Sequence, residues 1–94
     1  MQGAIRAHLT VKILGKVQGV AFRYAARVTA EELGLMGFVR NEDDGSVYLE
    51  AEGEKEGLEK FLKWCAEGPP ESKVEHVEVE WSTDLRGFQG FVVE

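Results

Sequence analysis

The chain has 94 residues, a length that suits one domain over residues 1–94 with a single hydrophobic core. It contains no apolar run long enough to cross a bilayer and no signal-peptide pattern, so we expect a cytoplasmic protein without a membrane partner. The net charge of −6 argues against DNA, RNA or an acidic membrane surface as the main partner.

The distribution of charge along the chain indicates which kind of ligand it suits, and the single cysteine limits the possible disulfides and metal clusters. Residues 1–30 contain five Lys or Arg and no Asp or Glu, whereas the rest of the chain carries all 17 acids. An acidic protein with one basic third suits a small anion better than a long polyanion. Cys65 excludes an internal disulfide and a multi-cysteine metal cluster, and its helical position predicts a small buried hydrophobe.

The hydrophobic pattern predicts strands and helices in a defined order. Alternation of apolar side chains predicts five strands, over residues 8–14, 36–41, 46–52, 76–81 and 88–93. Helical spacing predicts one helix from Phe22 to Leu33, which Gly34 ends, and a second over about residues 54–66. Asp44 and Gly45 are typical of a hairpin turn between the second and third strands.

This order, βαββαβ followed by a short strand, predicts an α+β fold: a ferredoxin-like sandwich with a mixed sheet and two helices on one face. We expect the other face to be exposed to solvent. The first and second strands should run parallel, joined by a right-handed crossover, with the third strand antiparallel between them. Their C-terminal ends then share one edge of the sheet, which brings the loop after the first strand within roughly 9.5 Å of Asn41.

The segment GKVQGVAFR, residues 15–23, has the character of an anion site. Gly15 and Gly19 free the backbone to curl, and no Ser, Thr, Asp or Asn stands ready to cap the helix that follows. Arg23 and Arg27 lie near the positive end of the helix dipole, where acids are usually preferred. Such a helix start is stabilised when an anion binds its free N–H groups.

A purely structural interpretation of this segment is also open, because glycines are common at strand-to-helix turns and Arg is a good helix former. The second predicted helix provides a comparison within the chain. It starts with Glu54 and Glu56 and carries Lys60 and Lys63 later, as the helix dipole prefers. One helix follows the rule and the other inverts it, which favours the anion site.

Asn41 is the second candidate residue. By alternation it shares a face with Gly37 and Val39, which we take to be the helix-covered face, so its side chain should turn toward the start of the first helix. Alone, an Asn here is typical of a turn residue that bonds the local backbone. Its expected position beside the uncapped helix favours a role in the site.

These motifs resemble those of the acylphosphatase family. The family's first signature is matched by Gly15, Val17, Gln18, Gly19, Val20, Phe22 and Arg23, and the second by Gly37, Val39, Asn41, Asp44, Gly45 and Val47. Gly68, Pro69 and Val74 fit a third, weaker feature, so the similarity covers roughly residues 8–93. The resemblance implies the same sandwich fold and hydrolysis of the carboxyl–phosphate bond of acyl phosphates, without metal or cofactor.

The resemblance also implies roles for individual residues. Arg23 would bind the phosphate, and Asn41 would position the attacking water. The phosphoryl oxygens would be bound by backbone N–H groups of the loop that comprises Gly15, Lys16, Val17, Gln18, Gly19, Val20, Ala21 and Phe22. Lys16 replaces a frequent Arg and keeps the charge, while Phe38 replaces a frequent Trp and keeps an aromatic ring off the catalytic face. The expected partners are a small acyl phosphate and inorganic phosphate, as product or inhibitor, and we expect a monomer.

Other interpretations compete with this one. An anion-binding module of the same fold without turnover would carry the same residues. An RNA-binding sandwich shares the element order and stacks bases on its open face, where Tyr48 lies. Glu50 and Glu52 lie beside Tyr48 with the same orientation, and they would repel a nucleic-acid backbone. From the chain length we expect a stand-alone enzyme rather than a fragment of a larger carbamoyl-transfer enzyme.

Two further groups of polar residues are not expected to take part in chemistry. His8 and His76 fall on the predicted solvent-exposed face of their strands. Glu42, Asp43 and Asp44 are typical of a solvated turn, an interpretation that we favour over a cation site.

Overall fold

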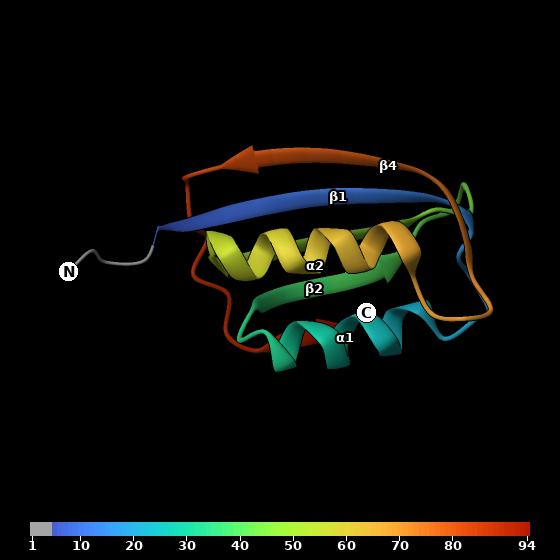
Figure 1. Cartoon of the computed structure of the whole chain (residues 1–94), viewed down its shortest axis with the longest axis horizontal. Helices are drawn as coiled ribbons and strands as arrows, with labels where there is room; N and C mark the ends of the chain where they lie inside the picture. The colour runs from blue at the N-terminus through green and yellow to red at the C-terminus, as the bar shows by residue number, and fades with distance from the viewer. Residues whose placement is uncertain (1–4) are drawn as a thin grey trace.

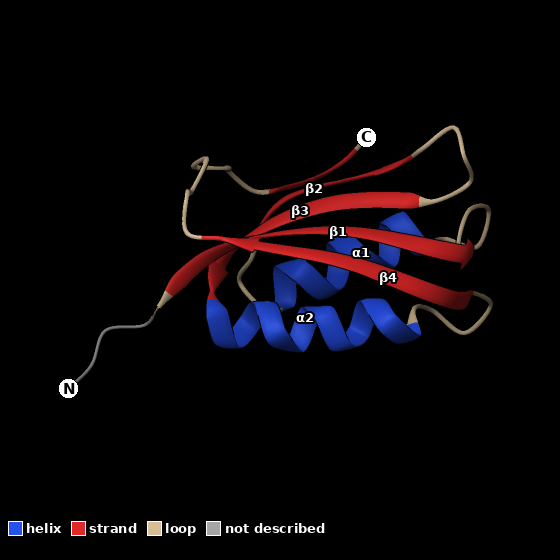
Figure 2. Ribbon diagram, turned by 90° about the horizontal axis from the view of Figure 1, so that it is seen from above, coloured by secondary structure: helices blue, strands red, loops and turns tan. Residues whose placement is uncertain are grey.

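Two helices and five strands follow one another in the order that the hydrophobic pattern predicts. The computed structural model describes residues 5–94. Its elements are β1 (Arg6–Lys16), α1 (Phe22–Glu32), β2 (Met36–Asn41), β3 (Val47–Glu54), α2 (Lys55–Glu67), β4 (Lys73–Ser82) and β5 (Phe91–Val93). The strand order in the sheet is β4-β1-β3-β2-β5, and both helices lie on one face (Figures 1 and 2). The ferredoxin-like sandwich is therefore confirmed.

The hydrophobic core lies between the sheet and the helices. Alternate residues of β1 and β3 point toward α1 and α2, and the fully buried side chains include Leu9, Val11, Ile13, Leu49, Phe22, Leu58 and Phe61. Cys65 is buried among them, and burial raises the pKa of its thiol, so it is a core residue as predicted. None of the helices in residues 5–94 is long and apolar enough to span a bilayer.

The strand pairing brings the ends of β1 and β2 to one edge of the sheet. Both strands pair antiparallel with β3, and Ile13, Val47 and Asn41 stand side by side across the three strands. β1 continues to Lys16 rather than ending at residue 14, because a register shift after Leu14 keeps it paired with β4. Gly15 is required at this point, since a Cβ there would lie 2.2 Å from the carbonyl oxygen of Lys73.

The prediction that the second face of the sheet is exposed to solvent is wrong over part of its area. His8, Glu50 and Glu52 are only 4%, 5% and 3% exposed. Residues 83–90 fold across this part of the sheet, and the ring of Phe88 packs 5.9 Å from that of His8. β5 therefore begins at Phe91 and not at residue 88. Alternation identifies the face of each side chain correctly, but it contains no information about a loop that covers that face.

Glu52 anchors this covering loop to the sheet. Its carboxylate accepts hydrogen bonds from the backbone N–H groups of Arg86, of Gly87 at 3.0 Å and of Phe88 at 3.4 Å, and lies 2.7 Å from Nδ1 of His8. Burial acts to raise the pKa of Glu52, but the hydrogen bonds from the loop backbone and from His8 together lower it. We call residues 83–90 the clasped loop.

Glu50 is covered by the same loop and has its own partners. It accepts a hydrogen bond of 2.6 Å from the hydroxyl of Tyr48 and lies 3.1 Å from Nε2 of His8. The assumption that Glu50 and Glu52 lie exposed beside Tyr48 is therefore wrong, because both carboxylates are buried. Glu78 and Glu80 are the acids that stay exposed on this face.

Replacing Glu52 by Gln should destabilise the fold by about 2 kcal/mol at pH 7, because the amide leaves a buried donor facing the N–H groups of the loop. Since the pKa of Glu52 lies below its ordinary value of 4.5, the stability that its ionised form contributes is present above that value. It should be lost as the pH falls through the lower pKa of the folded state. Urea unfolding of both proteins at neutral and acid pH measures this difference.

The matched control is Glu80→Gln, which removes an exposed acid from the same face and should change stability by less than about 0.5 kcal/mol. Equal stability of the Glu52→Gln and Glu80→Gln variants at pH 7 would show that Glu52 does not hold the clasped loop.

Candidate active site

The start of α1 is uncapped, as predicted. No side chain caps the helix, and its first turn contains no acid. Ala21, immediately before the helix, has φ +61°, and it is the one residue other than Gly in residues 5–94 with a left-handed φ. The first N–H groups of a helix have no partner within the helix itself. Backbone strain combined with free donors is typical of a binding site for a negatively charged group.

The start of α2 shows how the other helix of the same fold is completed. Glu54, at its cap position, makes no side-chain capping bond, but the N–H of Lys55 donates to the carbonyl oxygen of Ile5 at 2.7 Å. Glu56 adds an acid in the first turn. Neither an acid nor such a backbone partner stands at the start of α1 among the described residues. Neither helix start has a side-chain cap. They differ in that α2 has an acid in its first turn and a backbone partner for its first N–H group, whereas α1 has neither among the described residues.

Apolar side chains fasten the loop before α1 to the core. Val17 and Phe22 are buried, Val20 packs against the core cluster, and the ring of Phe22 lies 5.2 Å from that of Trp64. Gly19 has φ +74°, and a Cβ built there would meet no other atom within 4 Å. The side chains of the loop thus pack against the core, while the space around Gly19 is open to a ligand.

Gln18 fastens the same loop to the β2–β3 turn that follows Asn41. Its Nε2 donates to the carbonyl oxygen of Glu42 at 2.8 Å and to that of Ser46 at 2.9 Å. This double hydrogen bond fixes the distance between the loop and the end of β2. Gln18 therefore acts on the site through the backbone of the turn, and not as a lining residue.

Two acids of the β2–β3 turn, Glu42 and Asp44, have partners in the turn and in the neighbouring strands. Asp44 Oδ1 accepts from the Ser46 hydroxyl at 2.6 Å and from its N–H at 3.0 Å, while Oδ2 lies 2.9 Å from Lys12 Nζ. These contacts, the Ser46 hydroxyl first among them, hold the pKa of Asp44 well below its usual range. Glu42 pairs with Arg40 at 2.8 Å. Residues 5–94 contain no group of three His, Cys, Asp or Glu side chains arranged to hold a metal ion.

Arg23 and Asn41 lie in one small cavity at this edge of the sheet. Its volume is about 180 Å³, and its lining comprises Val17, Gly19, Ala21, Phe22, Arg23, Tyr24, Asn41 and Val93. Nη1 of Arg23 donates to the carbonyl oxygen of Glu94, whose own N–H donates to Val39 at 2.9 Å. The parallel pairing of β5 with β2 thus brings Glu94 within hydrogen-bond reach of the guanidinium.

The structure separates the nine predicted phosphate-binding residues into two groups. The first group lines the cavity and comprises Val17, Gly19, Ala21, Phe22 and Arg23. The second group supports it: Gly15 and Lys16 belong to β1, Gln18 bonds the turn, and Val20 packs on the core. His8 lies in the buried cluster under the clasped loop and His76 is exposed, so neither histidine lines the cavity.

Three residues of this site are missing from the sequence-based prediction: Tyr24, Val93 and Glu94. Tyr24 follows Arg23 directly, so its position in the first turn of α1 could have identified it as a residue of the site. Val93 and Glu94 reach the site only because β5 pairs with the outer edge of β2, and no local pattern in the sequence indicates that pairing.

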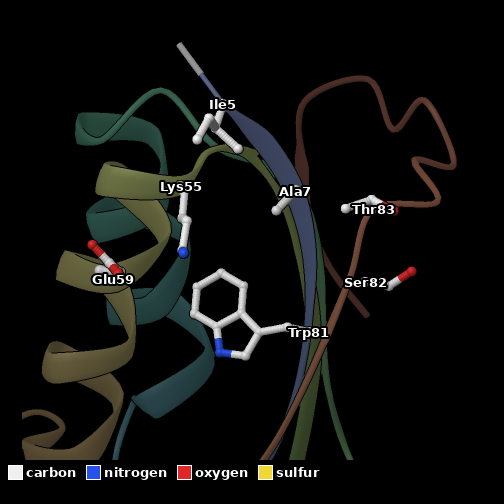
Figure 3. Close-up of a pocket in the computed structure, with 7 residues that line it drawn as sticks. All are labelled: Ile5, Ala7, Lys55, Glu59, Trp81, Ser82 and Thr83. Carbon is white, nitrogen blue, oxygen red and sulfur yellow. The ribbon is translucent and has the colours of Figure 1, made fainter.

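A second and larger hollow, of about 650 Å³, lies near the opposite end of β1. Figure 3 shows the Trp81 ring between the sheet and α2, with Lys55 beside it. This hollow adjoins the start of α2, where the first N–H is already bonded and Glu56 and Glu59 supply negative charge. It is therefore poorly suited to a phosphate, and the smaller cavity with Arg23 is the candidate active site.

Comparison with known proteins identifies the family of the chain. The Acylphosphatase family model matches residues 9–93. An acylphosphatase from Pelotomaculum thermopropionicum is 46% identical over 88 residues, which are 94% of this chain and 94% of that protein. The crystal structure of acylphosphatase from Bacillus subtilis is similar with a TM-score of 0.92 at 36% identity, covering 94% of this chain and 98% of that chain. An acylphosphatase structure from Coxiella burnetii matches over 100% of both chains, with a TM-score of 0.91 and 36% identity. On this evidence the chain belongs to the acylphosphatase family.

Proposed function

We propose that this protein hydrolyses the carboxyl–phosphate bond of acyl phosphates and releases a carboxylate and inorganic phosphate. The observation that carries the proposal is the cavity in which Arg23 and Asn41 meet the open start of α1. The acylphosphatases compared above are similar over almost the whole chain, which supports the same reaction.

In this proposal the phosphoryl group binds at the start of α1. The guanidinium of Arg23 offers two parallel N–H donors to two phosphoryl oxygens, a geometry that an ammonium group does not reproduce. Backbone N–H groups between Gly19 and Arg23 supply further donors at the positive end of the helix dipole. Because the loop and the guanidinium are already fixed by Gln18 and Glu94, little reorganisation is needed when charge develops on the phosphoryl oxygens.

Asn41 supplies the second half of the proposed mechanism. Its carboxamide oxygen can accept a hydrogen bond from water while its NH₂ group donates to a phosphoryl oxygen, which orients the water for in-line attack on phosphorus. The water oxygen forms the new bond to phosphorus, and the bond from phosphorus to the acyl oxygen breaks with its electron pair on the leaving carboxylate. A carboxylate is a weakly basic leaving group, so no strong general acid is required.

An amide is too weak a base to remove a proton from water, so in this proposal the proton goes to the phosphate of the substrate. The protein needs no metal or cofactor for this step. Inorganic phosphate then binds the same cavity as product and inhibitor. We propose that the enzyme works as a cytoplasmic monomer on small substrates, with neither nucleic acid nor membrane as partner.

The proposed activity is tested by phosphate release from acetyl phosphate, with phenyl phosphate as the control ester. We expect turnover of acetyl phosphate that a chelator does not reduce, and no turnover of the ester. Phenoxide is a much more basic leaving group than a carboxylate, and the cavity lining contains no Asp, Glu or His to protonate it. Phosphate binding without turnover of either compound would instead identify an anion-binding module. A pH–rate profile governed by an enzyme group near neutrality would contradict the proposed proton transfer.

The two proposed catalytic residues should fail in different ways. Arg23→Ala should weaken inhibition by inorganic phosphate and lower kcat/KM by about 100-fold or more, and Arg23→Lys should restore only part of the loss. We expect the Asn41 donor to strengthen its bond to the phosphoryl oxygen mainly in the transition state. Asn41→Ala should therefore leave the inhibition constant of phosphate within about two-fold while kcat falls by about 100-fold, since that donor and the positioned water are lost. Steady-state kinetics with phosphate inhibition measures both.

The matched control is Asp43→Ala, which truncates an exposed acid two residues beyond Asn41. Its kinetic constants should equal those of the wild type. If Asn41→Ala retained the wild-type kcat, the role assigned to its carboxamide would be wrong.

A further inference from the structure

The size of the cavity limits which part of an acyl phosphate it encloses. Its volume is about 180 Å³, whereas pockets that enclose a whole drug-sized ligand occupy about 300–1,000 Å³. In a cavity of this size the acyl group lies close to the phosphoryl group and in contact with the side chains that line the cavity. A longer acyl group has to lie at its mouth, against whichever side chains form the rim.

Tyr24 is the aromatic residue at this rim. It follows Arg23 in the first turn of α1, it lines the cavity, and it is 61% exposed. Val93, from β5, lines the same cavity and is 37% exposed. Single exposed apolar residues are common on protein surfaces and need no explanation by themselves. Here, however, the exposed ring adjoins the guanidinium proposed to bind the phosphate.

Arg27, one helical turn after Arg23, fixes the ring of Tyr24. Its guanidinium carbon lies over the ring at 5.4 Å from the centroid, a cation–π contact. Its Nε atom is buried and has no hydrogen-bond partner among the described residues, and the residue as a whole is half-buried. One face of the Tyr24 ring is thus occupied by Arg27, while most of the residue stays accessible.

We propose that Tyr24 determines acyl-group specificity, by binding aromatic acyl groups at the mouth of the cavity while the loop and Arg23 hold the phosphoryl group. The inference rests on the proposed function and names the class of substrate that the site prefers. Tyr24 lies on α1 and Asn41 on β2, so the acyl group and the attacking water have separate walls of the cavity available, as in-line displacement requires.

The test compares benzoyl phosphate with acetyl phosphate, which share the reacting bond and differ in the acyl group. Tyr24→Ala should raise KM for benzoyl phosphate about 5- to 10-fold, the range expected for a lost aromatic pair. The KM for acetyl phosphate, kcat for both substrates and the inhibition constant of inorganic phosphate should stay within about two-fold. Tyr24→Phe, which keeps the ring, should retain the KM of the wild type for benzoyl phosphate.

Trp81→Ala is the matched control, because it removes another partly exposed aromatic ring from the other hollow. It should change neither KM. Equal effects of Tyr24→Ala on the two substrates, or no effect on either, would overturn the proposal.

A binding measurement separates this inference from the proposed activity. Phenacylphosphonate and acetonylphosphonate, in which CH₂ replaces the bridging oxygen, mimic the two substrates and cannot be hydrolysed at that bond. Calorimetry should show tighter binding of phenacylphosphonate to the wild type, and no preference in Tyr24→Ala. If the wild type binds both analogues equally, the role of Tyr24 is wrong even if the enzyme is active. If it hydrolyses neither substrate but prefers phenacylphosphonate, the proposed activity fails and the aromatic site stands.

Discussion

The free N–H groups at the start of α1 are the constraint on which the rest of the site depends. Buried or partly buried backbone donors normally find partners, and at the start of α2 the carbonyl of Ile5 and an acid in the first turn complete the helix. At α1 the chain supplies a left-handed Ala21, a space beside Gly19 and a nearby Arg23 instead. We propose that an anion from outside the protein completes this arrangement, and this is the basis of the proposed phosphate site.

The fold delivers three distant segments to that helix start. Parallel β1 and β2 on either side of β3 bring the loop and Asn41 together, and Gln18 ties them with two hydrogen bonds. The parallel pairing of β5 with β2 adds Val93 and the Glu94 carbonyl that contacts Arg23. Because β5 is only three residues long, the clasped loop before it, held by Glu52, contributes to fixing its position. Contacts on the face of the sheet opposite the helices thus help to position residues of the site at the sheet's edge.

Local patterns predicted the fold and the centre of the site, because they depend on periodicity and turn chemistry. The element order, the edge shared by residues 15–23 and Asn41, and the acid-free start of α1 all follow from sequence. The sequence could not predict features that depend on contacts between distant segments. His8 and Glu52 have the pattern of exposed strand residues, and they are buried only because residues 83–90 fold over them. The family is confirmed by comparison, whereas the roles of Arg23 and Asn41 stay predictions.

The central claim is that the start of α1 binds phosphate through its backbone, and a titration of ¹⁵N-labelled protein with inorganic phosphate tests it directly. We expect saturable changes in amide chemical shift that are largest for Gly19, Ala21, Phe22 and Arg23. The amides at the start of α2, from Lys55 onward, should be unaffected, since their first donor is already bonded and acids lie nearby. Saturable changes centred on α2, or no saturable change at α1, would contradict the account.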